Sequence, residues 1–297
     1  MASLKQKKFT GSVSLLSWGY NEELLLENFF DRAVNLLESH VEDWEIIFVN
    51  DGSTDRSRAI ADEYASREPR LRVFHNEENR DIGYSCHKAI RMAQKSFIFW
   101  QTVDWSYNLK NIPIFLQLTN HFDVVQGVRP TPIRLLSYIP VLRSIYRVKN
   151  RSDNFRKAII SLGNYYILRI LFGIPFHDFQ NITIYRRAIF DDIILRGNSS
   201  FINPECLFRA YDKGFSFIEV PIPFIPRTDG EAKGTRIKSI LRSMGDIFLN
   251  WLRWGWKIRF FKHDRNQKHR QIYRVAEPFY LSDDVLRLIV TLFRDYR

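Results

Sequence analysis

Short apolar runs alternate with helical patterns over the first hundred residues, and this alternation constrains the fold more than any other feature of the chain. The apolar runs cover residues 13–16, 44–49, 71–74 and 97–101. Helical patterns fall between them, over 23–39, from about 53 to 66 and over 84–93. Strands that alternate with helices predict an α/β fold with a Rossmann-like, mostly parallel central sheet flanked by helices.

The loops that follow the predicted strands should meet at one edge of this sheet. Ligands of open parallel sheets bind beyond the carboxyl ends of the strands. We therefore expect one cleft, and its walls would be residues 17–22, 50–54, 76–83 and 102–106. Asp51 and Asp104 both fall at predicted strand ends, so both are candidate functional carboxylates.

Asp51 belongs to the segment NDGSTD, residues 50–55, directly after the second apolar run. A carboxylate at this place can accept hydrogen bonds from a base or a ribose, and the N-terminus of the following helix favours anions. The alternative interpretation is a turn in which Ser53 or Thr54 caps that helix, with Asp55 in its first turn.

Asp104 follows the fourth apolar run. A carboxylate there can hold a hard divalent cation, and such a cation can bind a diphosphate leaving group. One carboxylate is a poor metal site by itself, and a turn that ends the strand explains the same residues.

The second half of the chain is less regular. We expect strands over 123–128, 181–187 and 215–220, helices over 154–172 and 204–212, and a loop or short helix over 131–142. From residue 236 onward, an apolar helical stripe leads into Trp and Phe residues interleaved with Lys and Arg. Residues 236–274 hold eleven Lys and Arg against two Asp, a net charge of +9. This mixture predicts a membrane-surface segment, with a core helix and basic tail as the alternative.

Charge, cysteine spacing and hydropathy limit the kinds of partner and site that this chain can have. The net charge of +11 indicates an anionic partner, but no nucleic-acid-binding motif accompanies it, so we expect no nucleic acid. Cys86 and Cys206 lack metal-ligand spacing, which predicts reduced thiols in a cytosolic protein and no zinc site. The most apolar stretch, 158–176, is interrupted by Asn164 and Arg169, so we predict no transmembrane helix.

Seven segments between residues 12 and 234 carry a combined signature. They are VSLLSWGYNEE (13–23), EIIFVNDGSTD (45–55), RDIG (80–83), TVD (102–104), DVVQGVR (123–129), HDFQ (177–180) and EVPI (219–222), the last followed by Arg227, Gly230 and Lys233. In this order they resemble the family 2 glycosyltransferases with the GT-A fold, particularly polyprenyl-phosphate glycosyltransferases such as dolichol-phosphate mannose synthase.

The resemblance implies roles for the matching positions. The residues expected to bind the nucleotide sugar are Ser17, Tyr20, Glu22, Asn50, Asp51, Arg80, Asp81, Thr102 and Val103. The residues expected to take part in catalysis are Asp104, Asp178, Gln180 and Arg227. The residues expected at the phosphate groups or the acceptor are Arg129, Arg134, Glu205 and Lys233. Asp104 is also the expected ligand of Mg²⁺ or Mn²⁺.

Several positions depart from the family pattern. Thr102 replaces the first Asp of D-x-D, Asn50 replaces another Asp, Trp18 replaces a Pro and Ser106 replaces a Gln. A hydroxyl and one carboxylate bind Mg²⁺ or Mn²⁺ more weakly than two carboxylates. These changes leave open a weaker metal dependence, a different donor or an inactive relative.

The resemblance also implies an organisation and an activity. Residues 1–234 would form the GT-A domain, and 235–297 a basic, aromatic-rich helical extension. The activity implied is an inverting glycosyltransferase that moves a sugar from a nucleotide-diphosphate sugar to a polyprenyl phosphate. Transfer to a sugar hydroxyl of a lipid-linked or surface glycan, and an inactive GT-A scaffold, are the alternatives. We expect a peripheral protein at the cytoplasmic face of a membrane; its oligomeric state stays open.

Overall fold

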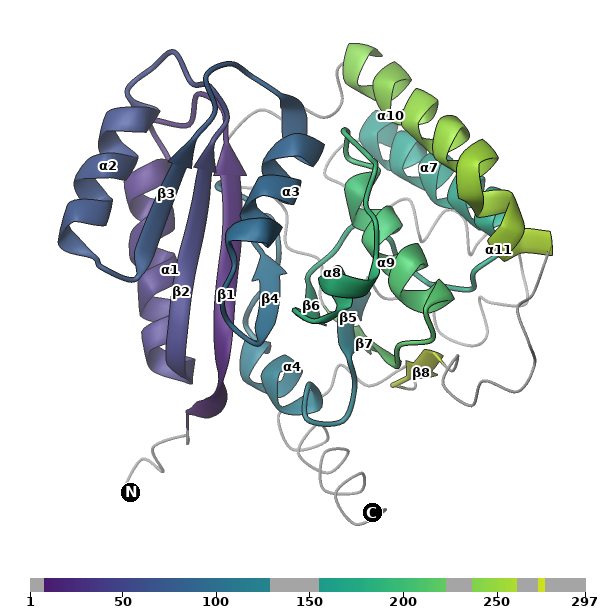
Figure 1. Ribbon diagram of the computed structural model, residues 1–297, viewed down its shortest axis with the longest axis horizontal. Helices are drawn as coiled ribbons and strands as arrows, with labels where there is room; N and C mark the ends of the chain where they lie inside the picture. Colours follow the sequence, from purple (N-terminus) through teal and green to yellow (C-terminus); the bar gives the residue numbers. More distant parts are fainter. Residues whose placement is uncertain (1–7, 129–154, 223–236, 261–271, 276–297) are drawn as a thin grey trace.

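The computed structural model describes residues 8–128, 155–222, 237–260 and 272–275 (Figure 1). Its strands are β1 (Phe9–Gly19), β2 (Val41–Asn50), β3 (Leu71–His75), β4 (Phe97–Trp100), β5 (Val124–Val128), β6 (Thr183–Arg186), β7 (Phe217–Pro221) and β8 (Ile272–Arg274). Its helices are α1 (Leu26–His40), α2 (Ser57–Arg67), α3 (Asp81–Met92), α4 (Ile112–Leu118), α7 (Phe155–Phe172), α8 (Ile189–Asp192), α9 (Ile202–Asp212), α10 (Ile237–Asn250) and α11 (Trp256–Phe260). A π-helical turn, η2 (Trp251–Gly255), joins α10 to α11.

These strands form one sheet in the order β3-β2-β1-β4-β6-β5-β7-β8. β1 runs parallel to β2 and to β4, and β6 is antiparallel to both of its neighbours, β4 and β5. The remaining pairs are parallel. The predicted α/β architecture with a mostly parallel sheet is confirmed.

Helices cover both faces of the sheet, because the strands are apolar on both sides. On β1, Leu15 packs into a core with α1, α2 and α4, whereas the next residue, Leu16, packs into a second core with α3, α7 and α9. Figure 1 shows α1 and α2 on the opposite side of the strands from α3. Cys86 and Cys206 are free thiols buried in the second core, and burial raises the pKa of both.

The segment α10–η2 contributes to the second core. Ile247 and Trp254 are buried there, and the Trp254 ring lies 5.2 Å from the ring of Phe172 between centroids. Gly255 allows this approach, because a Cβ at that residue would meet the Phe172 ring at 2.4 Å. The predicted boundary at residues 234 and 235 lies outside the described residues.

Local structure departs from the prediction at the start of α2. The helix begins at Ser57 rather than near residue 53, and neither Ser53 nor Thr54 caps it. Both residues form hydrogen bonds with Asn21 instead. Asp55 accepts the backbone N–H of Ser57 at 2.9 Å.

Helices α4 and α8 and strand β8 were not predicted, and the 131–142 segment lies outside the described residues. No helix in the described ranges is long and apolar enough to cross a membrane.

Candidate active site

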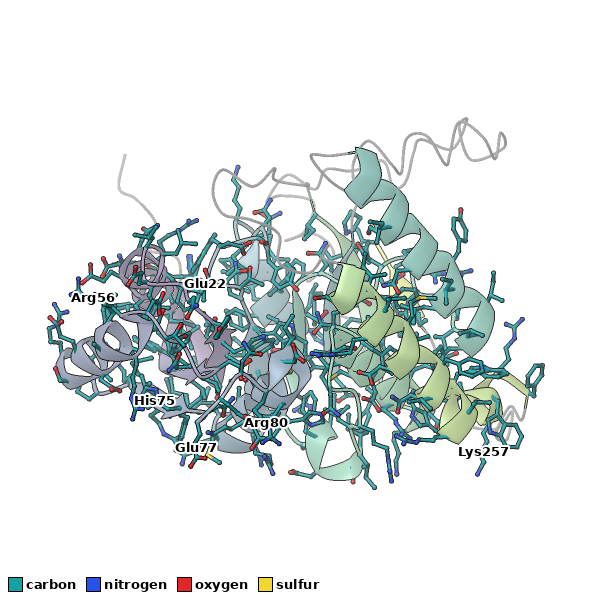
Figure 2. The ribbon with its side chains drawn as sticks, turned by 90° about the horizontal axis from the view of Figure 1, so that it is seen from above. Glu22, Arg56, His75, Glu77, Arg80 and Lys257 are labelled. Atoms are coloured by element: carbon teal, nitrogen blue, oxygen red, sulfur yellow. The ribbon has the colours of Figure 1, made fainter. Side chains whose placement is uncertain are left out.

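The carboxyl ends of β1, β2, β3 and β4 meet at one edge of the sheet, which Figure 2 views from above. Asp51 directly follows β2, and Asp104 lies in the loop after β4. Both carboxylates therefore belong to the same edge, as expected. β1 separates β2 from β4, so the two loops lie on either side of the end of β1. We call the loops 19–22, 50–55, 76–81 and 101–106 the carboxyl edge.

Asp51 is buried and held by two hydrogen bonds to one oxygen. Its Oδ1 accepts the Asn76 side-chain amide at 2.7 Å and the backbone N–H of Arg80 at 3.0 Å. Its own backbone N–H donates to the carbonyl of Gly19 at 2.9 Å. Within the described residues, Oδ2 makes no hydrogen bond.

Two neighbours give the 50–55 loop its shape. The Asn50 side chain contacts His75 Nδ1 at 3.2 Å and accepts the Ser53 N–H at 3.3 Å. Gly52 has a φ of 69°, and a Cβ there would lie 2.3 Å from the backbone of Glu78. Only glycine fits this close approach. Asn50 therefore acts on the loop itself in this structure.

The loop after β1 is joined to the 50–57 segment. Asn21, at a φ of 54°, bonds Ser53 and Thr54, and the Glu22 N–H donates to Ser57 Oγ at 2.8 Å. Tyr20 and Glu22 are half-buried at this edge. Ser17 lies deeper in β1, fully buried, and its hydroxyl has no hydrogen-bond partner among the described residues.

Arg80 and Asp81 begin α3 at the carboxyl edge. The Arg80 guanidinium lies 4.7 Å from the centre of the Tyr84 ring. Asp81 has a φ of 69° and forms an ion pair with Arg242 of α10. Helix α10 therefore reaches the edge that carries Asp51.

In the loop after β4, the three predicted residues Thr102, Val103 and Asp104 have different environments. The Thr102 hydroxyl accepts the Ser106 N–H at 3.0 Å, and Val103 is buried against Gly19. Asp104 is half-buried and accepts the Ser106 hydroxyl at 2.5 Å. Asp104 is thus the loop's one carboxylate, while Thr102 stabilises the turn and Val103 contributes its side chain to the core.

This loop offers a minimal site for a divalent cation. Among the residues that the structure describes, no group of three or more His, Cys, Asp or Glu could hold a metal ion. Mg²⁺ commonly binds through one or two carboxylates together with substrate phosphates and water. A single carboxylate such as Asp104 fits a cation held mainly by a diphosphate.

Asp178 and Gln180 lie just before β6. Because β6 is antiparallel to β4, its first residues lie at the same edge as the end of β4. The buried carboxylate of Asp178 accepts the Phe179 N–H at 2.8 Å. The backbone carbonyl of Asp178 accepts the side-chain amide of Gln126 at 2.7 Å. Gln180 is half-buried.

Glu205 lies beneath a loop rather than on an open surface. Its Oε2 accepts the N–H groups of Arg196 and Gly197 at 2.9 and 2.6 Å, and the residue is fully buried. Burial raises the pKa of Glu205, and the two amide hydrogen bonds act in the opposite direction. The resemblance implied a phosphate or acceptor contact, but in this structure Glu205 supports the loop, since its Oε2 holds the backbone of Arg196 and Gly197.

Four predicted residues, Arg129, Arg134, Arg227 and Lys233, lie outside the described residues. The structure also adds residues that the prediction did not single out. Asn76 links Asp51 to the hydroxyl of Ser85 at 2.9 Å and accepts Lys88 Nζ at 3.0 Å. Asn76 begins the segment 76–83, which the sequence predicted as one wall of the cleft, and this position was the available signal.

A buried carboxylate on β7 fastens the segment before β6. Glu219 accepts the backbone N–H of His177 at 2.7 Å and contacts His177 Nδ1 at 2.7 Å. Arg274 on β8 donates to the same carboxylate at 2.8 Å. Glu219 is the first residue of the EVPI segment, and it positions the chain that leads to Asp178.

Comparison with known proteins agrees with this architecture. The family model described as Glycosyl transferase family 2 matches residues 19–194. Glycosyltransferase AglD of Haloferax volcanii is 24% identical over 257 residues, which are 83% of this chain and 38% of AglD. The putative glycosyltransferase EpsH of Bacillus subtilis is 39% identical over 97 residues, 32% of this chain and 27% of EpsH. The chain therefore spans well under half the length of these two relatives.

A third relative is matched over most of its length. The dolichyl-phosphate hexose transferase of Haloferax volcanii is 29% identical over 216 residues, 72% of this chain and 82% of the relative.

Two solved structures show a similar fold. Mannosyltransferase PcManGT of Pyrobaculum calidifontis, in complex with GDP-Man and Mn²⁺, has a TM-score of 0.53 at 14% identity, over 82% of this chain and 65% of its own. Glucosyl-3-phosphoglycerate synthase of Mycobacterium tuberculosis, in complex with Mn²⁺, UDP and glucosyl-3-phosphoglycerate, has a TM-score of 0.54 at 14% identity, over 81% and 80%. At this identity the likeness shows the fold alone, and it is the predicted GT-A fold.

Proposed function

The chain belongs to glycosyltransferase family 2, and from this premise we propose that it transfers a sugar from a nucleotide-diphosphate sugar to a polyprenyl phosphate, with inversion at the anomeric carbon. The observation that carries the proposal is Asp51 at the carboxyl edge, where Oδ1 is fixed by Asn76 and Arg80 and Oδ2 makes no hydrogen bond among the described residues. Parallel sheets of this kind bind nucleotides beyond the strand ends.

The donor would lie across the ends of β1, β2 and β4. Asp51 would accept a hydrogen bond from the base or the ribose, and Arg80 and Asp81 would lie over the nucleotide, with Tyr20 and Glu22 beside it. Two observations support a nucleotide diphosphate: similar folds have been solved with GDP-Man and with UDP, and the loops named here fall within or beside the family match.

Asp104 would provide the protein's ligand for Mg²⁺ or Mn²⁺. When bound, such a cation supplies positive charge to the departing diphosphate. Thr102 would contribute indirectly, because its hydroxyl holds the turn through Ser106. Two proteins of similar fold have been solved with Mn²⁺, which supports this assignment.

A phosphate acceptor suits the chemistry of this chain. Such an acceptor is already an anion, so it needs no general base, and arginine and lysine side chains can hold it through charge-assisted hydrogen bonds. We propose that Arg129, Arg134, Arg227 and Lys233 do so, with Asp178 and Gln180 near the transferred sugar. The similarity to a dolichyl-phosphate hexose transferase supports a lipid phosphate as the acceptor.

We also propose that residues 236–274, the extension that would begin near residue 235, lie at a membrane surface and bring the carboxyl edge close to a lipid-borne acceptor. The support is the apolar surface of α10 and η2. Leu241, Phe248 and Leu252 are 67%, 54% and 49% exposed there.

The test is turnover by the full chain with UDP-sugar and GDP-sugar donors, Mn²⁺ and a polyprenyl phosphate, with the matching polyprenol as the control acceptor. We expect labelled sugar to enter the lipid fraction with the phosphate and not with the alcohol. Transfer to a glycan hydroxyl alone would favour the second acceptor class. Nucleotide binding with no turnover on any donor and acceptor would indicate an inactive scaffold.

A further inference from the structure

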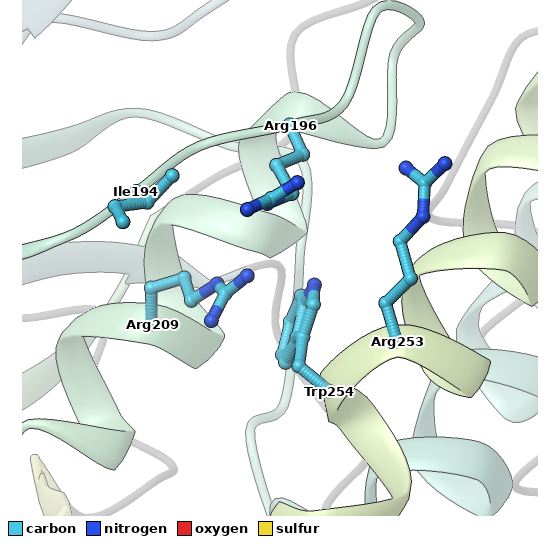
Figure 3. Close-up of a pocket in the computed structure, with 5 residues that line it drawn as sticks. All are labelled: Ile194, Arg196, Arg209, Arg253 and Trp254. Carbon is cyan, nitrogen blue, oxygen red and sulfur yellow. The ribbon is translucent and has the colours of Figure 1, made fainter.

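A basic pocket lies between α9 and η2 (Figure 3). It has a volume of about 410 Å³ and is lined by Ile194, Arg196, Arg209, Arg253 and Trp254. None of these residues belongs to the loops of the carboxyl edge. The pocket is therefore built from a different part of the chain, and the proposed transfer reaction makes no use of it.

Arg209 is less exposed than the two other arginines that line the pocket. Its guanidinium lies 3.8 Å from the centre of the Trp254 ring, and its Nε is buried without a hydrogen-bond partner among the described residues. The nearest acid is Glu205, whose Oε1 lies 3.7 Å from that Nε and also lacks a hydrogen bond. The other oxygen of Glu205 is occupied by two backbone N–H groups.

Two further guanidinium groups face the same space. Arg196 and Arg253 are exposed, and within the described part of the chain neither forms an ion pair with a carboxylate. Burial lowers the pKa of Arg209, and the positive charge of Arg196 acts in the same direction. The pocket therefore holds three positive charges beside one buried carboxylate.

The walls of the pocket are fixed before any ligand binds. The Trp254 indole N–H donates to Asn250 Oδ1 at 3.1 Å, and Glu205 holds the backbone of Arg196. Asp246 of α10 accepts the N–H groups of Asn198 and Ser199, both at 2.9 Å. A ligand would therefore meet a formed site and would need to order only the exposed arginine side chains.

We propose that this pocket binds the phosphate group of a phosphate ester. Guanidinium groups recognise phosphate oxygens through paired hydrogen bonds, and three of them line this pocket. Apolar surface adjoins the charges, because Ile194 at the pocket is 66% exposed and Leu252 of η2 is half exposed. This neighbourhood fits an ester with an apolar substituent, supplied either by a lipid headgroup or by a free phosphate ester.

The experiment compares binding by the full wild-type chain with two charge variants. The pocket variant is R196Q/R253Q, which removes two exposed groups and leaves the Arg209–Glu205 pair intact. The matched control is R91Q/K213Q, which removes two charges from exposed residues that lie outside the pocket and outside residues 236–274. The probes for calorimetric titration are dihexanoylphosphatidic acid below its micelle concentration, inorganic phosphate, and dihexanoylphosphatidylcholine.

We expect R196Q/R253Q to bind the phosphatidic acid at least about tenfold more weakly than wild type, with R91Q/K213Q within about twofold of wild type. A parallel loss for inorganic phosphate would identify the free anion as sufficient, and a loss for the lipid anion alone would identify the headgroup. Equal binding by wild type and R196Q/R253Q, or no binding of either anion by wild type, would overturn the proposal. Because the readout is binding, the result is independent of the transfer reaction.

Discussion

The side-chain amide of Asn76 donates a 2.7 Å hydrogen bond to the carboxylate of Asp51. Asn76 follows β3 and Asp51 follows β2, so this contact joins the ends of two neighbouring strands. It uses only Oδ1, and the Arg80 N–H binds the same atom. One oxygen of the carboxylate is therefore fixed by two hydrogen bonds, and the other makes none among the described residues.

Asp51→Asn should weaken nucleotide binding without changing the fold. The Oδ1 of an asparagine can still accept from Asn76 and Arg80, whereas the charge and the second acceptor oxygen are lost. We expect the dissociation constant for UDP or GDP, whichever binds, to rise at least about tenfold, or about 1.4 kcal/mol. Calorimetry measures this constant, and an unchanged melting temperature checks the fold.

The control for Asp51 is Asp43→Asn, which removes the same charge from the other end of β2, where the exposed Asp43 pairs with Lys95. Its nucleotide affinity should match that of the wild type. Equal affinity in Asp51→Asn and wild type would mean that the base and ribose are held by other residues.

Asp104→Asn should slow transfer, because Asp104 is the carboxylate that remains in the D-x-D position. We expect kcat/KM to fall at least about tenfold, a loss of roughly 1.4 kcal/mol of transition-state stabilisation. In the companion variant Thr102→Asp, Mn²⁺ should bind more tightly, since a second carboxylate enters the same turn. Unchanged turnover in Asp104→Asn, with the fold intact, would show that the leaving-group charge is neutralised elsewhere.

The fold was predictable from the sequence where local pattern and global structure agree. The apolar runs before Asp51 and Asp104 became β2 and β4, because strands buried on both faces must be continuously apolar. The start of α2 was not predictable in the same way. Ser53 and Thr54 have the side chains of capping residues, but they bond Asn21, more than thirty positions away, and no local pattern contains that contact.

The residues of the candidate site likewise fall into those that local pattern predicted and those that it did not. Asp51 and Asp104 were found because a strand end fixes where a side chain emerges. Asn76 was not singled out, because its role depends on the register between β2 and β3. Val103 and Glu205 were assigned by resemblance at their positions, yet the structure buries both side chains. Position in a motif identifies a loop, whereas the contacts of each side chain decide its role. Glu205 holds the backbone of Arg196 and Gly197, and Val103 packs in the core.

The buried carboxyl of Glu205 should give the protein a measurable pH dependence. Burial raises its pKa above the ordinary value of 4.5. As pH rises through that value, the unfolded chain releases the proton before the folded chain does, so the free energy of unfolding falls until the folded group also ionises. Glu205→Gln removes this titration.

We therefore expect the melting temperature of the wild type, minus that of Glu205→Gln, to decrease as pH rises from about 4 to about 7. Thermal unfolding across this range measures the difference. Glu63→Gln, at an exposed residue of α2, should show no comparable trend. A difference between wild type and Glu205→Gln that stays constant or grows with pH would contradict the assignment.

The last prediction concerns the surface of α10 and η2. Phe248 and Leu252 are 54% and 49% exposed on elements whose other side, at Ile247 and Trp254, is buried in the core. Inserting an exposed side chain of this size into a lipid interface contributes on the order of 1 kcal/mol or more, and each nearby Lys or Arg adds about 1 kcal/mol at an anionic surface. The wild type should therefore co-sediment with vesicles that contain anionic lipid, and less so at high salt.

Phe248→Ser/Leu252→Ser should reduce the bound fraction severalfold, whereas Leu24→Ser, at a residue 91% exposed before α1, should not. If the wild type stays in the supernatant at every lipid composition and salt concentration, the segment is a packed helix with a basic surface, and a soluble acceptor becomes the better hypothesis.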